Sequence, residues 1–284
     1  MIPPKKSLGQ HFLTNPRYCS QILELAEITP SDTVLEIGPG TGFLTSYLIS
    51  NADRVTALEF DRDMVALLDE KFSKEIRRIP PRLRIVQSNV LSADWRKLLF
   101  QLRESRDSGN DRQAQSLPKI AGNLPYNIST RILEYSTHYK DWFQSFTFMC
   151  QKEVAARILA SPGSPDYGYF TLLMEFNFHR KSGFDVPPGA FTPAPKVISH
   201  VMQLRPRFID TACRATFVRI IKTAFRQRRK TIYNNLKPLF QDPKELSRVL
   251  NDSGIPEKTR PQQISLEQFL AVSNTCCRMV SFKA

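Results

Sequence analysis

The sequence lacks several features, and each absence excludes a class of protein. Its 284 residues contain no uninterrupted apolar run of about 18 residues, so no membrane-spanning helix is expected. The five cysteines form no CxxC pair, which argues against a disulfide framework. The four histidines show no HExxH or HxH spacing, so we expect no metal site. No apolar stretch follows the first lysines, so we predict no secretory signal and a cytoplasmic location.

Acidic residues are also scarce. The chain has 27 Asp and Glu against 40 Lys and Arg, a net charge of +13. Most of the excess lies in residues 205–284, which contain 16 basic and 6 acidic residues. The densest basic run contains Arg226, Arg228, Arg229 and Lys230. An isolated run of this kind is usually only a solvated surface, but the excess over the whole segment favours a nucleic-acid partner.

Hydrophobic patterning predicts two domains. Short apolar runs alternate with helix-like segments, which is typical of βαβ units and a parallel sheet covered on both faces. We expect strands at residues 33–37, 54–59, 83–87, 119–123, 145–150 and 197–204, and helices at 43–50, 62–72 and 154–159. The polar stretch 101–118 reads as a surface loop. Further helices are expected at 212–224, 230–240, 243–250 and 265–277. The chain should therefore form an α/β domain over 1–206 and a small all-helical domain over 207–284.

A glycine-rich turn follows the first predicted strand. In Glu36-Ile-Gly-Pro-Gly-Thr-Gly42 the glycines allow a sharp turn and a close approach of a ligand to the backbone. Glu59 ends the next strand, where a carboxylate can accept hydrogen bonds from ribose hydroxyls. These features indicate a nucleoside cofactor. The GxGxG spacing lacks the later glycine of the dinucleotide fingerprint, which disfavours NAD, and a purely structural turn remains an alternative.

A second turn, Asn123-Leu-Pro-Tyr126, follows the fourth predicted strand. Open α/β sheets bind ligands at the carboxyl ends of their strands, where this turn should lie. The Asn123 oxygen and a neighbouring carbonyl can accept the two N–H bonds of an exocyclic amine, while Tyr126 can stack on the base. Such placed acceptors favour attack by a weakly nucleophilic adenine amine on an electrophilic methyl group. As a bare tetrapeptide, the same residues are also compatible with an ordinary turn.

Six motifs together resemble the KsgA/RsmA family of small-subunit ribosomal RNA adenine dimethyltransferases. They occur in order along nearly the whole chain: Gly9-Gln-His-Phe-Leu13, Glu36-Ile-Gly-Pro-Gly40, Asn123-Leu-Pro-Tyr-Asn-Ile-Ser129, Gln151-Lys-Glu-Val154, Ala190-Phe-Thr-Pro-Ala-Pro-Lys-Val197 and Ala224-Phe-Arg-Gln-Arg-Arg-Lys-Thr231. Only the stretch near 101–118 stands outside the resemblance, as an insertion. The resemblance implies a Rossmann-like S-adenosylmethionine-dependent methyltransferase sheet with a small helical C-terminal domain that binds ribosomal RNA.

The resemblance also implies a cofactor site. His11 and Leu13 lie in the N-terminal segment that contacts S-adenosylmethionine, Gly38 approaches it through the backbone, and Glu59 holds its ribose. Asn89 stands where the family usually carries Asp, facing the adenine amine of the cofactor. An amide oxygen can still accept that hydrogen bond, but without the assistance of charge. Asn123 is expected to contact both the cofactor and the target base.

The target site implied by the family is built on the second turn. Asn123 and the Leu124 carbonyl hold the target N6, Pro125 rigidifies the turn, and Tyr126 stacks on the base. Phe191 is expected to cover the opposite face of the base, with packing in the core as its alternative.

The implied reaction is transfer of two methyl groups to N6 of each of two adjacent adenosines near the 3′ end of 16S ribosomal RNA, during biogenesis of the small subunit. Each base has to leave its stack to reach the pocket. The resemblance implies a monomer that binds this RNA within the small ribosomal subunit. Two alternatives remain: a non-catalytic RNA-binding assembly factor on the same fold, and a methyltransferase acting on large-subunit RNA.

Overall fold

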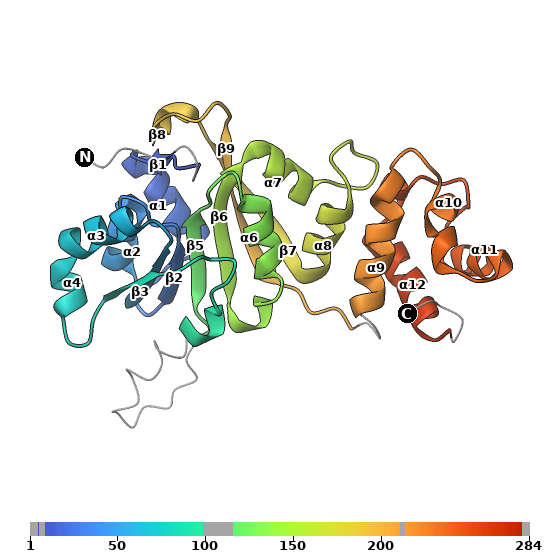
Figure 1. The fold of residues 1–284 in the computed structure, drawn as a ribbon, viewed down its shortest axis with the longest axis horizontal. Coiled ribbons are helices and arrows are strands. Elements are labelled where there is room, and N and C mark those ends of the chain that lie inside the picture. Colours follow the sequence, from blue (N-terminus) through green and yellow to red (C-terminus); the bar gives the residue numbers. More distant parts are fainter. Residues whose placement is uncertain (1–4, 6–8, 99–115, 211–213, 280–284) are drawn as a thin grey trace, which may run out of the picture. The chain divides into compact units, whose positions relative to one another are not determined.

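The computed structural model describes residue 5 and residues 9–98, 116–210 and 214–279. The chain divides into two compact units (Figure 1). The first contains Met1–Ala155 and His179–Pro206, and the second contains Ala156–Phe178 and Arg207–Ala284. The expected surface loop at 101–118 falls almost entirely outside the described residues. No helix in the described ranges is long and apolar enough to cross a membrane.

The first unit is built on a seven-stranded sheet with the order β4-β3-β2-β5-β6-β9-β7. Its strands are β2 (Thr33–Ile37), β3 (Arg54–Glu59), β4 (Leu83–Gln87), β5 (Lys119–Asn123), β6 (Ser145–Gln151), β7 (Phe178–Val186) and β9 (Ser199–Pro206). The pairs from β4 to β6 are all parallel, as the sequence predicts. The pair β6–β9 is antiparallel, so the sheet is mixed at one side, which the βαβ pattern did not indicate. A separate short pair joins β1 (Phe12–Leu13) to β8 (Phe191–Thr192).

The strand order reverses direction between β2 and β5. The chain proceeds outward from β2 through β3 to β4, and then returns to place β5 on the other side of β2. A crevice forms outside the carboxyl ends of the strands at such a switch point. Gly38, directly after β2, and Asn123, at the end of β5, lie on its two sides. A Cβ atom added to Gly38 would be 3.4 Å from the Asn123 carbonyl oxygen.

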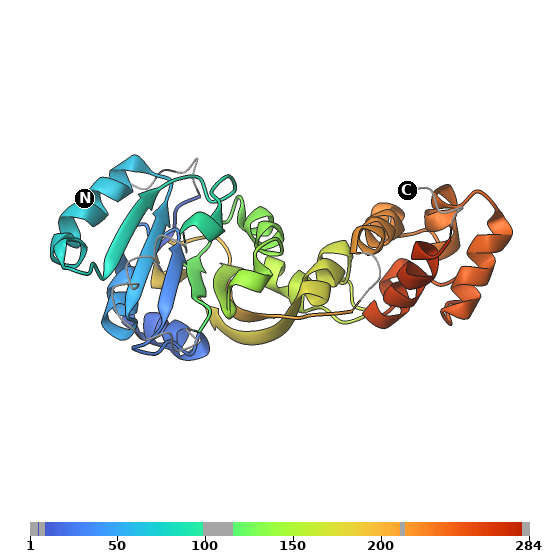
Figure 2. The ribbon, with the colours of Figure 1, turned by 90° about the horizontal axis from the view of Figure 1, so that it is seen from below.

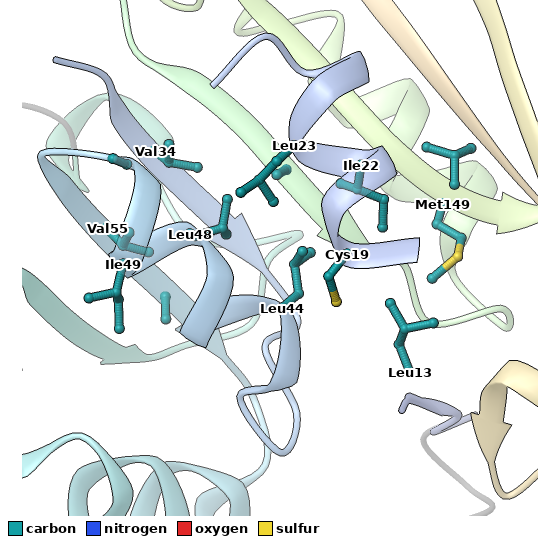
Figure 3. Packing of buried hydrophobic residues seen from close by; sticks show 14 of the residues in the cluster. Leu13, Cys19, Ile22, Leu23, Val34, Leu44, Leu48, Ile49, Val55 and Met149 are labelled. Atoms are coloured by element: carbon teal, nitrogen blue, oxygen red, sulfur yellow. The ribbon is translucent and has the colours of Figure 1, made fainter. Parts of the chain in front are cut away.

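Helices cover the sheet of the first unit on both faces (Figure 2). They are α1 (Pro16–Leu25), α2 (Phe43–Asn51), α3 (Arg62–Lys71), α4 (Ser73–Arg77), α6 (Ser129–Ser136) and the start of α7 (Lys152–Leu159). Figure 3 shows the core between α1, α2 and the strands, where Ile22, Leu48 and Val34 pack together. On α6, the Tyr135 ring meets the buried ring of Trp95 edge to face at 5.4 Å.

The second unit is helical. It contains α8 (Tyr169–Asn177), α9 (Arg214–Ala224), α10 (Ile232–Leu236), α11 (Pro243–Asp252) and α12 (Leu266–Cys277). Side-chain caps mark several starts; Ser265, for example, accepts from the Gln268 backbone N–H at 3.3 Å in a capping box. The expected helix at 230–240 is shorter, because Thr231 caps α10 and the chain passes into a 3₁₀ turn at Lys237–Leu239.

The division into units differs from a single boundary at residue 206/207. Helix α8 packs with the C-terminal helices, because its apolar side chains meet theirs: the rings of Phe176 and Phe217 stack at 4.4 Å. The Tyr167 hydroxyl also donates to the Ile264 carbonyl at 2.8 Å. The chain therefore enters the helical unit at Ala156, returns to the sheet at His179 for β7 and β9, and enters again at Arg207.

Candidate active site

A cavity of about 480 Å³ lies at the carboxyl edge of the parallel strands. Its wall comes from the N-terminal segment, the glycine turn after β2, and the chain following β3, β4 and β5. Eight residues expected at the site line it: His11, Gly38, Glu59, Asn89, Asn123, Leu124, Pro125 and Tyr126. The structure therefore brings together residues that are more than 100 positions apart in the sequence.

The conformation of the glycine turn disfavours side chains at two of its glycines. Gly38 and Gly40 have φ values of +70° and +54°, in the left-handed region that favours glycine. A Cβ atom on Gly40 would also come within 2.7 Å of the Phe12 ring. Lys71 stabilises the turn from behind, where its Nζ donates to the carbonyls of Thr41 at 3.0 Å and Gly42 at 3.2 Å. The turn thus exposes backbone to the cavity in a fixed shape.

Glu59 is held rigidly in the wall, at the end of β3. Its two carboxylate oxygens accept backbone N–H groups from Gly40 at 3.1 Å, Phe60 at 2.7 Å and Asp61 at 2.8 Å. Burial raises the pKa of Glu59, while these backbone hydrogen bonds oppose the rise. A carboxylate oriented in this way can accept hydrogen bonds from vicinal hydroxyls.

The Asn123 side chain has one end fixed and the other available. Its Nδ2 donates to the His11 carbonyl at 2.8 Å. Its Oδ1 is buried and has no hydrogen-bond partner among the residues that the structure describes. A buried acceptor without a partner is costly, and because Asn123 lines the cavity, this atom is available to a donor from a ligand.

The turn after Asn123 is anchored at both ends. The Leu124 N–H donates to the Met149 carbonyl at 2.9 Å, which continues the pairing of β5 with β6. The Tyr126 hydroxyl forms a hydrogen bond with the Ser199 hydroxyl at the start of β9. Burial raises the pKa of Tyr126. The ring centroids of Tyr126 and His11 lie 5.2 Å apart. The tyrosine ring is therefore held on the wall near the Asn123 amide.

The part of the wall after β3 and β4 is suited to a planar group. Asn89 is exposed, and its Oδ1 accepts the Leu91 N–H at 2.9 Å, which shapes the loop after β4. Phe60 lines the cavity with 57% of its surface exposed, so part of its apolar surface is accessible to a ligand. Together these residues offer a polar edge and an apolar face.

The N-terminal segment is tied to α3 by a polar cluster. Lys5 Nζ lies 2.6 Å from Asp61 Oδ1 and 2.7 Å from Asp63 Oδ2, and Gln10 Nε2 donates to Asp61 Oδ2 at 3.0 Å. The sequence indicates only a helix cap and surface charge at Asp61 and Asp63. Asp61 does cap α3, accepting the Asp63 N–H at 3.1 Å, but it also binds Lys5 and Gln10 of the N-terminal segment.

Two predicted site residues lie elsewhere. Leu13 and Phe191 are each 4% exposed, face one another across the β1–β8 pair, and belong to the core cluster. Neither lines the cavity as described. For Phe191 this arrangement favours the packing alternative over stacking on the target base, because a ring enclosed by the core presents no face to a ligand.

Sequence reasoning also missed residues of the wall, among them Gln10, Phe60 and Arg131. Phe60 follows Glu59 directly, so its position next to an expected ribose-binding acid was a usable signal. Arg131 lies on α6, a helix that the sequence pattern did not predict, and nothing local indicates that it reaches the cavity.

The basic run of the second unit is exposed, but its members differ. Arg226, Arg229 and Lys230 are exposed, whereas Arg228 Nη2 donates to the carbonyls of Pro165 at 2.6 Å and Tyr167 at 3.1 Å. Buried Asn235 reaches the same loop, and its Nδ2 lies within 3.1–3.4 Å of three loop carbonyls. Asn235 and Arg228 therefore fix the loop through hydrogen bonds. The side chains of Arg226, Arg229 and Lys230 remain exposed to solvent or to a partner.

The fold and the site together define a class of protein. A sheet of this strand order, with a glycine turn, an acidic residue closing the next strand and an Asn-Leu-Pro-Tyr turn across the switch point, is that of an S-adenosylmethionine-dependent methyltransferase. The model of the family described as "Ribosomal RNA adenine dimethylase" matches residues 3–277. The chain belongs to this family, and it is an rRNA adenine methyltransferase.

Individual relatives agree over nearly the whole length. Proteins named "Ribosomal RNA small subunit methyltransferase A" from Magnetococcus marinus and Geobacter metallireducens are 39% and 36% identical, each over 96% of this chain, and covering 92% and 95% of their own lengths. Among solved structures, a dimethyladenosine transferase from Plasmodium falciparum is similar with a TM-score of 0.74 and 22% identity, over 92% of this chain and 96% of its own. The 23S rRNA methyltransferase ErmE is similar with a TM-score of 0.66 and 24% identity, over 92% and 98%. These two likenesses concern the fold.

Proposed function

We propose that this protein dimethylates N6 of two adjacent adenosines near the 3′ end of 16S ribosomal RNA, within the small subunit during its biogenesis. The observation that carries the proposal is the Asn123 amide. Its nitrogen is committed to the His11 carbonyl at 2.8 Å, which directs a buried oxygen without a partner, among the described residues, to the N–H of a ligand. The names of the relatives from Magnetococcus marinus and Geobacter metallireducens support the small subunit as the source of the RNA.

The residues present fit S-adenosylmethionine, which supplies a methyl group on a cationic sulfur when bound. Glu59 accepts from the ribose hydroxyls, and Gly38 allows the backbone to approach the methionine portion. Asn89 and Phe60 both line the cavity, where the amide oxygen would accept from the cofactor's adenine amine and the exposed ring would cover the adenine. The cavity volume of about 480 Å³ is within the range for a ligand of this size.

The target adenine is held by the turn after β5. Asn123 Oδ1 and the Leu124 carbonyl accept the two N–H groups of N6, and the Tyr126 ring stacks on the base. These acceptors draw the nitrogen lone pair away from conjugation with the ring, which favours attack on the methyl group without a covalent intermediate on the protein. Ser199 fixes the tyrosine hydroxyl, and therefore the plane of the stacking ring.

The helical unit positions the RNA. Arg226, Arg229 and Lys230 bind phosphates of folded ribosomal RNA, which gives affinity without sequence recognition. The pocket then selects an adenine that has left its stack. We further propose that the protein acts as a monomer in the cytoplasm, where its substrate is assembled.

The test uses labelled S-adenosylmethionine with unmethylated small subunits, large subunits and naked RNA. We expect label in small-subunit RNA only, recovered as N6,N6-dimethyladenosine. Asn123→Ala should lower the rate about 100-fold or more, because it removes the acceptor from the attacking amine. Asn51→Ala, at the exposed end of α2, is the matched control and should leave the rate unchanged.

Other outcomes identify the alternatives. Label in large-subunit RNA alone would support a methyltransferase of the other subunit. Binding to small subunits with no label anywhere would support a non-catalytic assembly factor. Near wild-type methylation by Asn123→Ala would refute the role of the amide while leaving the substrate assignment in place.

A further inference from the structure

We propose that Asp61 is a positioning residue that holds residues 9–13 across the cavity, and that it thereby fixes both the cofactor side and the Asn123 side of the site. This role rests on the proposed function for the identity of the two ligands. The sequence indicates only a helix cap at Asp61. Asp61 is not among the residues that line the cavity, so its contribution has to pass through residues that do.

The Asp61 carboxylate is buried, and it gathers donors from two parts of the chain. Its side chain is 2% exposed, and its Oδ1 accepts from the Asp63 N–H at 3.1 Å and from Lys5 Nζ at 2.6 Å. Its Oδ2 accepts from Gln10 Nε2 at 3.0 Å. Burial alone would raise the pKa of Asp61, but the hydrogen bonds from Lys5 and Gln10 outweigh burial and lower it. The carboxylate is therefore charged at neutral pH, and its hydrogen bond with Gln10 is of the stronger, charge-assisted kind.

Gln10 connects this carboxylate to the cavity, because Gln10 itself lines the wall. Both ends of its side-chain amide are engaged. Its Oε1 accepts the Lys5 N–H at 2.9 Å, while its Nε2 donates to Asp61. An amide with both ends engaged has one favoured orientation, since turning it over would break both hydrogen bonds. The position of Gln10 is therefore fixed relative to the start of α3.

The same segment reaches the other side of the cavity. A Cβ atom added to Gly9 would lie 3.2 Å from Asn127 Oδ1, so the backbone there runs close to the turn after β5. The next residue but one, His11, accepts the Asn123 Nδ2 hydrogen bond on its carbonyl at 2.8 Å. This hydrogen bond sets the direction of the Asn123 amide. A shift of the segment would therefore change where Asn123 Oδ1 points.

Asp61 is joined to the cofactor side by its backbone. Its N–H donates to Glu59 Oε1 at 2.8 Å, and Glu59 is the carboxylate that accepts from the cofactor's ribose in the proposed function. One residue thus contacts the ribose-binding acid through its backbone and the N-terminal segment through its side chain. Breaking the hydrogen bond between Asp61 and Gln10 should therefore weaken cofactor binding and also slow the reaction at saturating cofactor.

The variant Asp61→Asn breaks this link with little change of shape. Asparagine caps helices as well as aspartate does, so its Oδ1 can still accept the Asp63 N–H and α3 is retained. Its Nδ2 replaces Oδ2 and places a donor opposite the Gln10 donor, and the charge that attracts Lys5 is lost. Asp69→Asn is the matched control, because it removes the same charge from an exposed position of the same helix.

The first measurement is hydrogen exchange, followed by mass spectrometry on the protein without ligands. Peptides that cover residues 9–14 should exchange about tenfold faster in Asp61→Asn, while α3 keeps its wild-type protection. Asp69→Asn should match the wild type in both regions. Unchanged exchange in residues 9–14 would overturn the proposal. An equal loss of protection in α3 would also overturn it, because Asp61 would then act only as a helix cap.

The second measurement is a double-mutant cycle on cofactor binding. Calorimetry with S-adenosylhomocysteine gives dissociation constants for the wild type, Asp61→Asn, Gln10→Met and the double variant. We expect Asp61→Asn to weaken binding about tenfold, and the double variant to bind no more weakly than Gln10→Met alone, because Asp61 acts through Gln10. Effects that add in the double variant would show that the two residues act independently, which would overturn the proposal.

The third measurement separates this inference from the proposed function. In single-turnover methylation of small subunits at saturating cofactor, Asp61→Asn should be about tenfold slower than the wild type, because the Asn123 amide is no longer directed. A wild-type rate at saturation would show that only the cofactor is affected, and the link to Asn123 would be wrong. If the wild type does not methylate this RNA at all, the proposed function fails. The exchange and calorimetry results would still decide the role of Asp61.

Discussion

At the scale of single residues, Asn89 stands where the family resemblance leads us to expect Asp. Its Oδ1 accepts the Leu91 N–H at 2.9 Å, a hydrogen bond that a carboxylate would keep. We predict that Asn89→Asp tightens binding of S-adenosylmethionine by about 1 kcal/mol, or about fivefold, because the acceptor gains charge. Isothermal calorimetry measures this, with Asn51→Asp as the control. Weaker binding by Asn89→Asp would contradict it.

Glu36 is a second residue that leads to a prediction, because its raised pKa makes the stability of the fold depend on pH. It is buried beneath the glycine turn, where desolvation raises its pKa from 4.5 to about 8, and the nearby Glu59 charge adds to the rise. Between these values the folded state holds a proton that the unfolded chain has released. The free energy of unfolding should therefore fall as pH rises through this window, by up to about 1.4 kcal/mol per pH unit.

Glu36→Gln removes that titration while keeping the shape of the side chain. We predict that denaturant unfolding shows a smaller loss of stability between pH 5 and pH 8 in Glu36→Gln than in the wild type. Glu70→Gln, at an exposed position of α3, serves as the control and should keep the wild-type pH dependence. An unchanged pH dependence in Glu36→Gln would mean that Glu36 ionises in the folded protein near its ordinary pKa.

The positions of some site residues could be predicted from the sequence, and those of others could not. Glu59 and Asn123 end strands whose bounds the sequence predicted correctly, so their place at the crevice followed from the strand geometry. Phe191 depends on a two-residue pairing with β1, which has no periodicity to detect. The link between Asn123 and His11 joins residues 112 positions apart, and no local pattern encodes it.

At the scale of elements, the basic loop after α9 is shaped by Asn235. The buried amide is within 3.1–3.4 Å of the Gln227, Lys230 and Thr231 carbonyls. Asn235→Ala leaves three partly buried carbonyls without that donor, so we predict a loss of about 1 kcal/mol in the stability of the helical unit. Thermal unfolding measures it, and the exposed neighbour provides the control: Asn234→Ala should cost much less.

The elements themselves divide into those that the sequence predicted and those that it did not. Strands β2 to β5 were predicted with their observed bounds, because apolar runs there stop at glycine or polar residues. Helix α8 was missed because it is apolar on most sides, with seven of its nine residues buried, so it lacks the stripe of an amphipathic helix. Strand β7 carries mostly exposed polar residues and gave no strand signal.

At the scale of the whole molecule, the basic run lies in the second unit, whereas the cavity lies in the first unit. We predict that Arg226→Gln, Arg229→Gln and Lys230→Gln together weaken binding to small subunits and lower the log–log salt slope by about 2–3. Affinity for S-adenosylmethionine should remain unchanged, since the cavity lies wholly in the first unit. Filter binding across a salt series and calorimetry measure the two effects.

Arg228 is left out of that triple variant because its guanidinium donates hydrogen bonds to the Pro165 and Tyr167 carbonyls. Arg228→Gln alone is a useful comparison, since it should lower stability more than RNA affinity. A loss of cofactor binding in the triple variant would show that the run is structural, and the assignment of these three side chains to RNA would then be wrong.

The helical unit is formed by two separate segments of the chain, and these segments leave the ribosome at different times. Helix α8 leaves the ribosome before the chain that forms β9 and well before α9, whose Phe217 covers Phe176. Until then the apolar side chains of α8 are exposed to solvent. Chaperones that bind exposed hydrophobic surface can therefore bind the nascent protein. A stop codon after Pro206 would make that state permanent. Shortening the gene is thus a route to aggregation, and a working minimal methyltransferase has to keep or redesign the residues between Ala156 and Phe178.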